Sequence, residues 1–195
     1  MITPRQDPRP VYRAAVTWVH ELMAAVREHQ LDDPTPCAAF DVRTLLGHLV
    51  GTAERSLATA RGRPTGRVPH VVTNVVDHDL ATRFLAVSAA AAGAWSAPMR
   101  LEALVVAPWG EVEGRSAVWG FTNETLVHGW DIAVATGQPC EAAADLVEPV
   151  LGRAHQLVPE STRKGRAYDP VFASRPCAGP TERLANWHGR HWPLV

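Results

Sequence analysis

The chain has 195 residues and a formal net charge of -1, from 19 basic and 20 acidic residues. This length is enough for one self-sufficient core, and the balanced charge argues against nucleic acid or an anionic membrane surface as a partner. No apolar run approaches the roughly 20 residues of a membrane span, and the first residues lack the apolar segment of a signal peptide, so we expect a cytoplasmic protein.

The first three predicted helices follow from apolar periodicity. Residues 10–29 place apolar side chains at steps of three and four, which is typical of an amphipathic helix. A proline-rich stretch at 32–36 ends it, and Asp41 is a suitable N-cap for a second helix that stops near Gly62. After a loop rich in glycine, proline and arginine, a third helix is predicted over 73–95.

The second half of the chain predicts extended structure, two helices and a tail. Residues 101–106 resemble a short strand, and residues 108–114 form a turn. A fourth helix is predicted over 115–136, with Gly137 as its C-cap, and a fifth over 141–158. From Pro159 onward, prolines are spaced too closely for long helices, so we expect an irregular tail.

These elements predict an all-α fold. We expect a four-helix bundle with one appended helix, a short β-like excursion between helices three and four, and an irregular C-terminal tail. Ligands in such bundles project inward from facing helices. Trp119 and Trp130 are predicted to be core residues.

A candidate metal site is centred on the fourth helix, where residues 123–131 read Asn-Glu-Thr-Leu-Val-His-Gly-Trp-Asp. Glu124 and His128 are four positions apart and share one helix face. The best third candidate is His48, which lies at the edge of the apolar stripe of the second helix. Two histidines and one carboxylate suit zinc, nickel or iron(II) and leave positions open. Such a pair also occurs by chance, and a histidine beside leucines is more often half-buried and satisfied by hydrogen bonds.

The same residues carry a resemblance to a known family. The chain is similar to the actinobacterial metal-binding branch of the DinB-like superfamily, and in particular to the N-terminal domain of mycothiol-dependent maleylpyruvate isomerase. The segments that carry the resemblance are 34–37 (Pro-Thr-Pro-Cys), 41–48 (Asp-Val-Arg-Thr-Leu-Leu-Gly-His), 126–138 (Leu-Val-His-Gly-Trp-Asp-Ile-Ala-Val-Ala-Thr-Gly-Gln) and Gly189-Arg190. The resemblance implies a four-helix bundle whose metal ligands are His48, Glu124 and His128. The chain has no room for the second domain of that isomerase, so we expect a single domain over residues 1–195.

Several residues near these ligands have two interpretations. Asp131 could fix the tautomer of a ligating histidine, although an aspartate near the end of a helix more often pairs with an arginine. Gly47 and Gly51 flank His48, either to leave room for a substrate or to allow close approach of another helix.

Cysteine and histidine residues outside the motif are also ambiguous. The three cysteines, Cys37, Cys140 and Cys177, indicate neither a disulfide framework nor a thiolate zinc site, and Cys37 is a packing residue or, less often, a reactive thiol. The tail departs from the family pattern at His188 and His191, and with Trp187 it could close the mouth of the site, although solvated residues are the commoner outcome.

For function, the resemblance implies a metal-dependent enzyme that uses mycothiol or a similar thiol for isomerisation of, or S-transfer to, a small electrophile. The alternatives are a non-catalytic metal- or ligand-binding bundle and a metal-dependent hydrolase. Gly51, Thr52 and Phe121 lie within about one helical turn of the ligands and are predicted to contact the substrate. No separate catalytic base is identifiable. Zinc is the preferred metal, and a monomer or homodimer is expected.

Overall fold

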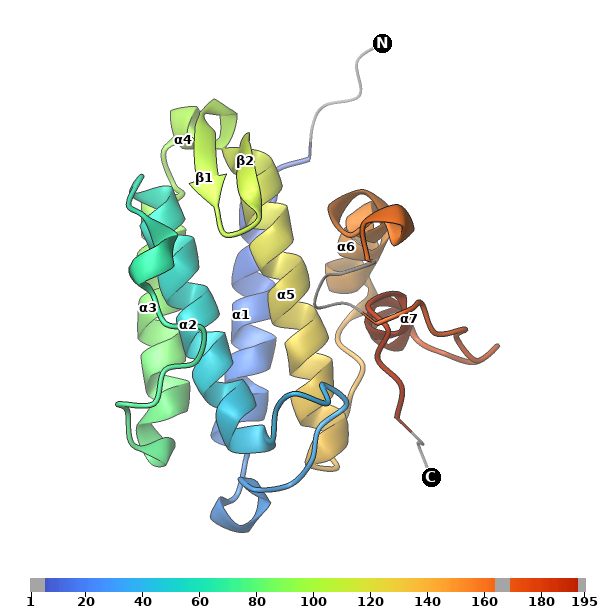
Figure 1. Ribbon diagram of the computed structural model, residues 1–195. Coiled ribbons are helices and arrows are strands. Elements are labelled where there is room, and N and C mark those ends of the chain that lie inside the picture. The colour runs from blue at the N-terminus through green and yellow to red at the C-terminus, as the bar shows by residue number, and fades with distance from the viewer. Residues whose placement is uncertain (1–5, 164–168, 193–195) are drawn as a thin grey trace.

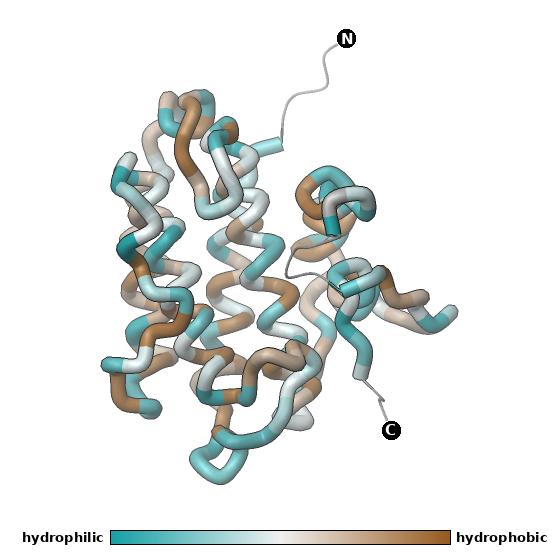
Figure 2. Tube along the Cα trace, in the orientation of Figure 1, coloured by the Kyte–Doolittle hydropathy of each residue, from teal (hydrophilic) through white to brown (hydrophobic). Residues whose placement is uncertain are grey.

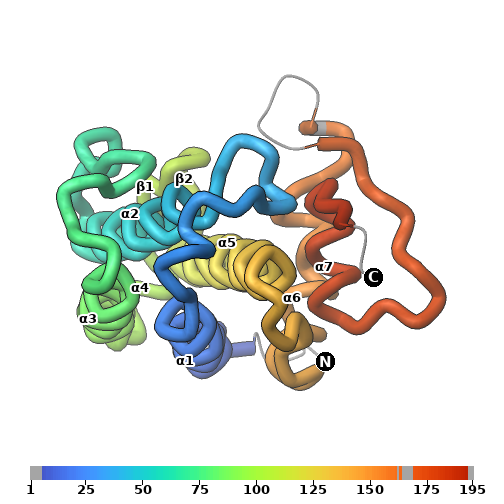
Figure 3. Tube along the Cα trace, turned by 90° about the horizontal axis from the view of Figure 1, so that it is seen from below, coloured from blue at the N-terminus to red at the C-terminus, as the bar shows by residue number. Residues whose placement is uncertain are grey.

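The computed structural model describes residues 6–163 and 169–192, and four long helices form its main body (Figure 1). They are α1 (Arg9–Ala24), α2 (Val42–Ala60), α3 (Leu80–Ala94) and α5 (Gly114–Ala135). Helix α2 packs against α3 and α5, and α1 packs against the same two helices, so the four helices form a closed square seen end-on in Figure 3. The fold is therefore an all-α, DinB-like bundle, as predicted. In the described part of the chain, no helix is long and apolar enough to span a membrane.

A helical turn and a β-hairpin cap one end of the bundle. Helix α4 (Pro98–Glu102) leads into strand β1 (Leu104–Ala107), which pairs antiparallel with β2 (Gly110–Glu113). Ala107 lies opposite Gly110, so Pro108 and Trp109 form the turn between the strands. This confirms the predicted excursion before the fourth helix, and part of the predicted turn forms the second strand. The hairpin turn points along α5 toward the middle of the bundle (Figure 1).

Three helices are shorter than predicted: the fifth loses three residues at its start and one at its end, and the first and third differ more. The first helix ends at Ala24, and a 3-10 turn follows at Glu28–Gln30, where the Gln30 side chain donates to the Thr136 carbonyl oxygen at the end of α5. The third helix begins at Leu80, seven residues later than expected. The residues before it include asparagine, two aspartates and β-branched valines, which favour turns and caps over a helix interior. The other 3-10 turns are Thr65–Arg67, Asp77–Asp79 and Glu160–Thr162.

The predicted ends of the ligand-bearing helices are confirmed. The Asp41 carboxylate accepts a hydrogen bond from the Thr44 backbone N–H at 2.8 Å, which is an N-cap for α2. Gly137 has a φ of 68°, the left-handed conformation that closes the C-terminus of α5.

The C-terminal tail contains a helix that the sequence did not predict. Helix α6 (Ala144–Leu157) corresponds to the expected fifth helix, whereas α7 (Pro180–Trp187) lies in the region expected to be irregular. Pro180 is in the first turn of α7, where its missing N–H costs nothing, and the next proline is at 193, so two turns fit between them.

Two apolar clusters hold these parts together. One fills the bundle between α1, α2, α3 and α5, and the other packs α6 and α7 against the opposite side of α5. Trp119 and Trp130 of α5 are buried, as predicted. Figure 2 shows apolar and polar residues alternating along the bundle helices, as expected for helices that bury one side.

Candidate metal centre

Helix α2 presents its site residues as one stripe. His48, Thr52 and Arg55 follow one another at steps of four and three, and all three are buried. Beside this stripe, the loop that follows α2 covers the helix at Gly47 and Gly51. A Cβ atom on Gly51 would lie 2.8 Å from the Pro69 carbonyl oxygen, and one on Gly47 would lie 2.5 Å from the Val72 carbonyl oxygen.

The glycines therefore serve the approach of a loop, because backbone carbonyl groups occupy the space that a side chain would fill. Loop backbone covers Gly51, the glycine predicted to contact the substrate, and Gly51 does not line the cavity described below. The alternative interpretation of Gly47 and Gly51 was close approach of another helix. The segment that approaches them is a loop.

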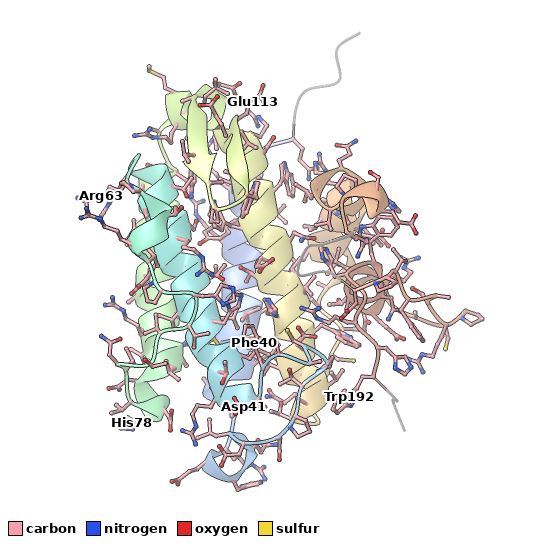
Figure 4. All side chains as sticks on the ribbon, in the orientation of Figure 1. Phe40, Asp41, Arg63, His78, Glu113 and Trp192 are labelled. Atoms are coloured by element: carbon pink, nitrogen blue, oxygen red, sulfur yellow. The ribbon has the colours of Figure 1, made fainter. Side chains whose placement is uncertain are left out.

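Helix α5 contributes the other two predicted ligands. Glu124 and His128 lie one turn apart on the face of α5 that meets α2. The Glu124 side chain is 30% exposed and His128 is buried. Phe40, labelled in Figure 4 between α2 and α5, packs its ring 5.1 Å from that of His48 and 6.4 Å from that of His128. His48, Glu124 and His128 thus share a site that is mostly shielded from solvent and is exposed on the Glu124 side.

The three predicted ligands converge on one point. Glu124 Oε1 is 3.5 Å from His48 Nε2 and 3.5 Å from His128 Nε2, and the three atoms lie within 4.8 Å of one another. Two ligands bound to zinc at about 2.1 Å with a tetrahedral angle are about 3.4 Å apart. The spacing therefore fits a single divalent cation.

Hydrogen bonds on the far side of each ring favour the same interpretation. His48 Nδ1 is 3.0 Å from the His70 carbonyl oxygen, and His128 Nδ1 is 2.9 Å from Asp131 Oδ2. Both partners are acceptors, so each Nδ1 donates, and in the neutral ring the Nε2 lone pair faces Glu124. Three electron-rich atoms that face one another need a cation or a proton between them. The donor set therefore fits the metal that the family resemblance implies.

Burial and hydrogen bonds between the histidines and nearby carboxylates set the pKa values of the site residues. Burial lowers the pKa of His48 to about 4, against the opposing effect of Glu124, so this ring is neutral at pH 7. Burial would also lower the pKa of His128, but hydrogen bonds to Asp131 and Glu124 raise it above its ordinary value. For Glu124, burial is outweighed by hydrogen bonds from both rings, and its pKa lies well below the usual range. A proton on His128 therefore competes with a metal for this site.

Asp131 contacts both a histidine and an arginine. Its Oδ2 atom accepts from His128 Nδ1 and also, at 3.1 Å, from Arg190 Nε. The Arg190 guanidinium further lies 3.4 Å from Cys37 Sγ, and Cys37 is buried, as the packing interpretation predicted. Cys37, His128 and Asp131 form a second group of close ligand-type atoms. Because Asp131 is fully buried and already bound to Arg190, we interpret it as the group that orients His128.

A cavity of about 520 Å³ opens above the candidate ligands. Thr52 and Phe121, both predicted substrate contacts, line it, together with Pro108 and Trp109 of the hairpin turn. A volume of this size suits a small organic ligand.

The tail contributes two residues to this cavity. His188 is buried, and its Nε2 atom is 3.0 Å from Asn123 Oδ1, so the interpretation as a solvated residue was wrong for it. Arg190 lines the cavity as well. In contrast, the Trp187 indole donates to the Val158 carbonyl oxygen, and the His191 ring stacks 4.2 Å from Phe172. Neither of these two lines the cavity, so of the three tail residues predicted near the site only His188 reaches it.

Comparisons with known proteins identify a family and two relatives. The family model described as the mycothiol maleylpyruvate isomerase N-terminal domain matches residues 12–133, which include the three candidate ligands. The uncharacterized proteins Rv0738 and MT0763, from two strains of Mycobacterium tuberculosis, are each 32% identical to the chain over 195 residues, covering 94% of this chain and 98% of theirs. No solved structure matches the chain.

Proposed function

Because the chain belongs to the mycothiol maleylpyruvate isomerase N-terminal domain family, within the DinB-like superfamily, we propose that it is a metal-dependent enzyme that uses a low-molecular-weight thiol. The reaction would be isomerisation of, or S-transfer to, a small electrophilic molecule, and the whole chain would act as one domain. The observation that carries the proposal is the convergence of His48, Glu124 and His128 at the floor of a small cavity.

A divalent ion such as zinc, held by these three residues, would act as a Lewis acid that brings the pKa of a thiol to near or below neutrality. The protein residues would then supply position and environment. Asp131 and the His70 carbonyl oxygen hold the two imidazoles in the required tautomer. Phe40 and Phe121 exclude water from one side of the floor, which strengthens electrostatic interactions there.

Thr52 is suited to contact the ligand. Its hydroxyl oxygen lies 3.4 Å from His48 Nε2 and accepts a hydrogen bond from Arg55 Nη2 at 2.9 Å. In the neutral His48 ring Nε2 is an acceptor, so the Thr52 hydroxyl donates to it; once an ion occupied that lone pair, the hydroxyl proton would be available to a ligand in the cavity. His70 also lines the cavity, with its ring centre 4.5 Å from that of His48, so it would be available as a separate base beside activation of the nucleophile by the ion itself.

The first test is metal content. Protein purified without added metal should contain close to one equivalent of a divalent ion by elemental analysis, and His128→Ala should lose most of it. His78→Ala is the matched control, since His78 is exposed in the 3-10 turn Asp77–Asp79 (Figure 4) and should keep the full content. Full metal content in His128→Ala would show that the ligand assignment is wrong.

The second test concerns the thiol. Cobalt-substituted protein should develop a near-ultraviolet charge-transfer band when mycothiol is added, because sulfur coordination produces such a band. If no thiol changes the cobalt spectrum at millimolar concentration while metal content is normal, the thiol-dependent reaction is excluded. The binding-protein and hydrolase alternatives would then be preferred.

A further inference from the structure

A buried arginine lies beside the candidate metal centre and is not needed to hold it. Arg55 is 9% exposed and lines the cavity, three residues after Thr52 on the same stripe of α2. One hydroxyl group separates its guanidinium from the His48 imidazole, since Thr52 Oγ1 contacts both.

All the hydrogen-bond partners recorded for Arg55 are electrically neutral. Nη2 donates to Thr52 Oγ1 at 2.9 Å, and Nη1 donates to the Pro69 carbonyl oxygen at 3.0 Å and more weakly to the His70 carbonyl oxygen at 3.4 Å. In residues 6–163 and 169–192, no carboxylate forms an ion pair with this guanidinium. A guanidinium has five N–H groups, so donors remain for another partner.

The nearest acidic residues are already engaged. Glu54, the preceding residue, forms an ion pair with Arg83 at 2.7 Å, and Glu124 contacts the two histidines. Burial lowers the pKa of Arg55, and the negative charges of Glu124 and Glu54 only partly oppose this effect. An arginine stays charged in proteins, so this position holds a positive charge without a bound counter-charge. A buried charge of this kind is costly unless an anion pairs with it.

Arg190, the other arginine of the cavity lining, differs in this respect. It is bound to Asp131 and is therefore neutralised within the protein. Of the two arginines that line the cavity, Arg55 is therefore the one whose charge is available to a ligand. The walls around it are apolar, with Val68 from the loop and Trp109 from the hairpin turn.

We propose that Arg55 binds the carboxylate group of a small organic ligand whose opposite end lies at the candidate metal centre. Such a ligand is a short molecule with an apolar middle, matched to the walls formed by Val68, Trp109 and Phe121. A planar guanidinium suits a planar carboxylate in a bidentate pair. One arginine with neutral neighbours is a poor match for a phosphate group, which carries more charge and more acceptor oxygens.

The anion site itself does not depend on the metal, whereas its assignment to the substrate rests on the proposed function. The substrate would then be an electrophile that carries a carboxylate a few bonds from the reacting atom. The two claims can be tested separately, because anion binding is measurable on metal-free protein.

The test uses calorimetric titration of chelator-treated, full-length protein with three probes: butyrate, its neutral isostere butyramide, and inorganic phosphate. Butyrate should bind at least about ten-fold more tightly than butyramide, as expected for a charge-assisted hydrogen bond in a desolvated site. Arg55→Gln should remove this preference, and Arg55→Lys should keep part of it. Arg63→Gln is the matched control, because Arg63 follows α2 and points into solvent (Figure 4), and it should bind like the wild type.

A second measurement does not depend on the folding of Arg55→Gln. The NMR resonance of the Arg55 Nε–H group, assigned by its loss in Arg55→Lys, should shift on addition of butyrate and not of butyramide. An unmoved resonance, or equal binding of butyrate and butyramide by the wild type, would overturn the proposal. Tighter binding of phosphate than of butyrate would overturn the choice of carboxylate. Normal anion binding by a wild-type protein that binds no metal would reject the proposed function alone.

Discussion

The two sides of α5 differ in what they contribute to the candidate site. The side that packs on α2 carries Glu124 and His128 and faces His48 of α2, and all three candidate ligands belong to the segment matched by the family model. The side that packs on α6 and α7 is contacted by the later part of the chain, which supplies no predicted ligand but places Arg190 on Asp131 and His188 on Asn123. The ligands are thus provided by one region and held in orientation partly by the other. The predictions below test this division, starting with the largest expected effect.

Loss of Arg190 should be the most damaging change in the later region. Arg190→Met leaves the fully buried Asp131 carboxylate without its cation, which should cost about 3–5 kcal/mol of unfolding free energy. Metal affinity should also fall by about 10- to 100-fold, since Asp131 orients His128. Denaturant titration and competition with a chromophoric chelator measure the two effects.

The matched control is Arg183→Met. Arg183 lies on α7, and its ion pair with Glu148 is exposed, so the substitution should cost about 0–1 kcal/mol. If both variants lost the same stability, or if Arg190→Met bound metal normally, the later region would not act on the ligands through Asp131.

Acidification should weaken the later region through His188. Burial lowers the pKa of His188 to about 3, with Arg190 and Arg163 acting in the same direction and Glu124 opposing them. Between pH 6.5 and about 3 the ring is neutral when folded and protonated when unfolded, so the unfolded chain binds more protons and stability falls as pH falls. The loss should reach about 3 kcal/mol by pH 4.

The variant His188→Gln isolates this effect from the titration of His48 and His128. Its unfolding free energy should depend less steeply on pH across the same window than that of the wild type, measured on metal-free protein. Parallel curves for the two proteins would show that His188 is not held neutral in the fold.

Metal removal should affect mainly α2 and α5, and the later region with α6 and α7 less. Because the ion would join α2 to α5, it should stabilise the fold by about 2.7 kcal/mol when free metal is 100 times its dissociation constant. Hydrogen exchange should then show lost protection in α2 and the middle of α5 after chelation, with α7 changing least. A melting temperature that does not respond to chelator would contradict any contribution of the ion to stability, and His128→Ala should show no such response.

The periodicity of α2 and α5 explains why the bundle and the ligand cluster could be predicted. A helix fixes which residues share a face, so Glu124 and His128 had to lie together, and Asp41 and Gly137 marked the helix ends. That His48 faces them depends on the packing of α2 against α5, which the family resemblance supplied.

The contacts of the later region left no comparable trace in the sequence. Asp131 and Arg190 are 59 residues apart, and no helical or strand period relates them. The proline spacing after Pro159 suggested an irregular tail, although one proline begins α7. Arg55 could have been found, because it lies seven residues after His48 and therefore on the same face of the predicted second helix. Its importance became clear only from the neutral character of its partners.

The smallest effect concerns the starts of two helices, one in each region. Asp41 caps α2 with its side chain, whereas α6 begins after Ala143, which has the extended backbone of an N-cap residue and no side-chain hydrogen bond. Ala143→Ser should therefore raise the unfolding free energy by about 0.5–1 kcal/mol, and Asp41→Ala should lower it by a similar amount. Hydrogen exchange should assign the gain to α6 and the loss to α2. An unchanged stability in Ala143→Ser, beside a clear loss in Asp41→Ala, would mean that packing against α5 limits the later region and that its helix start does not.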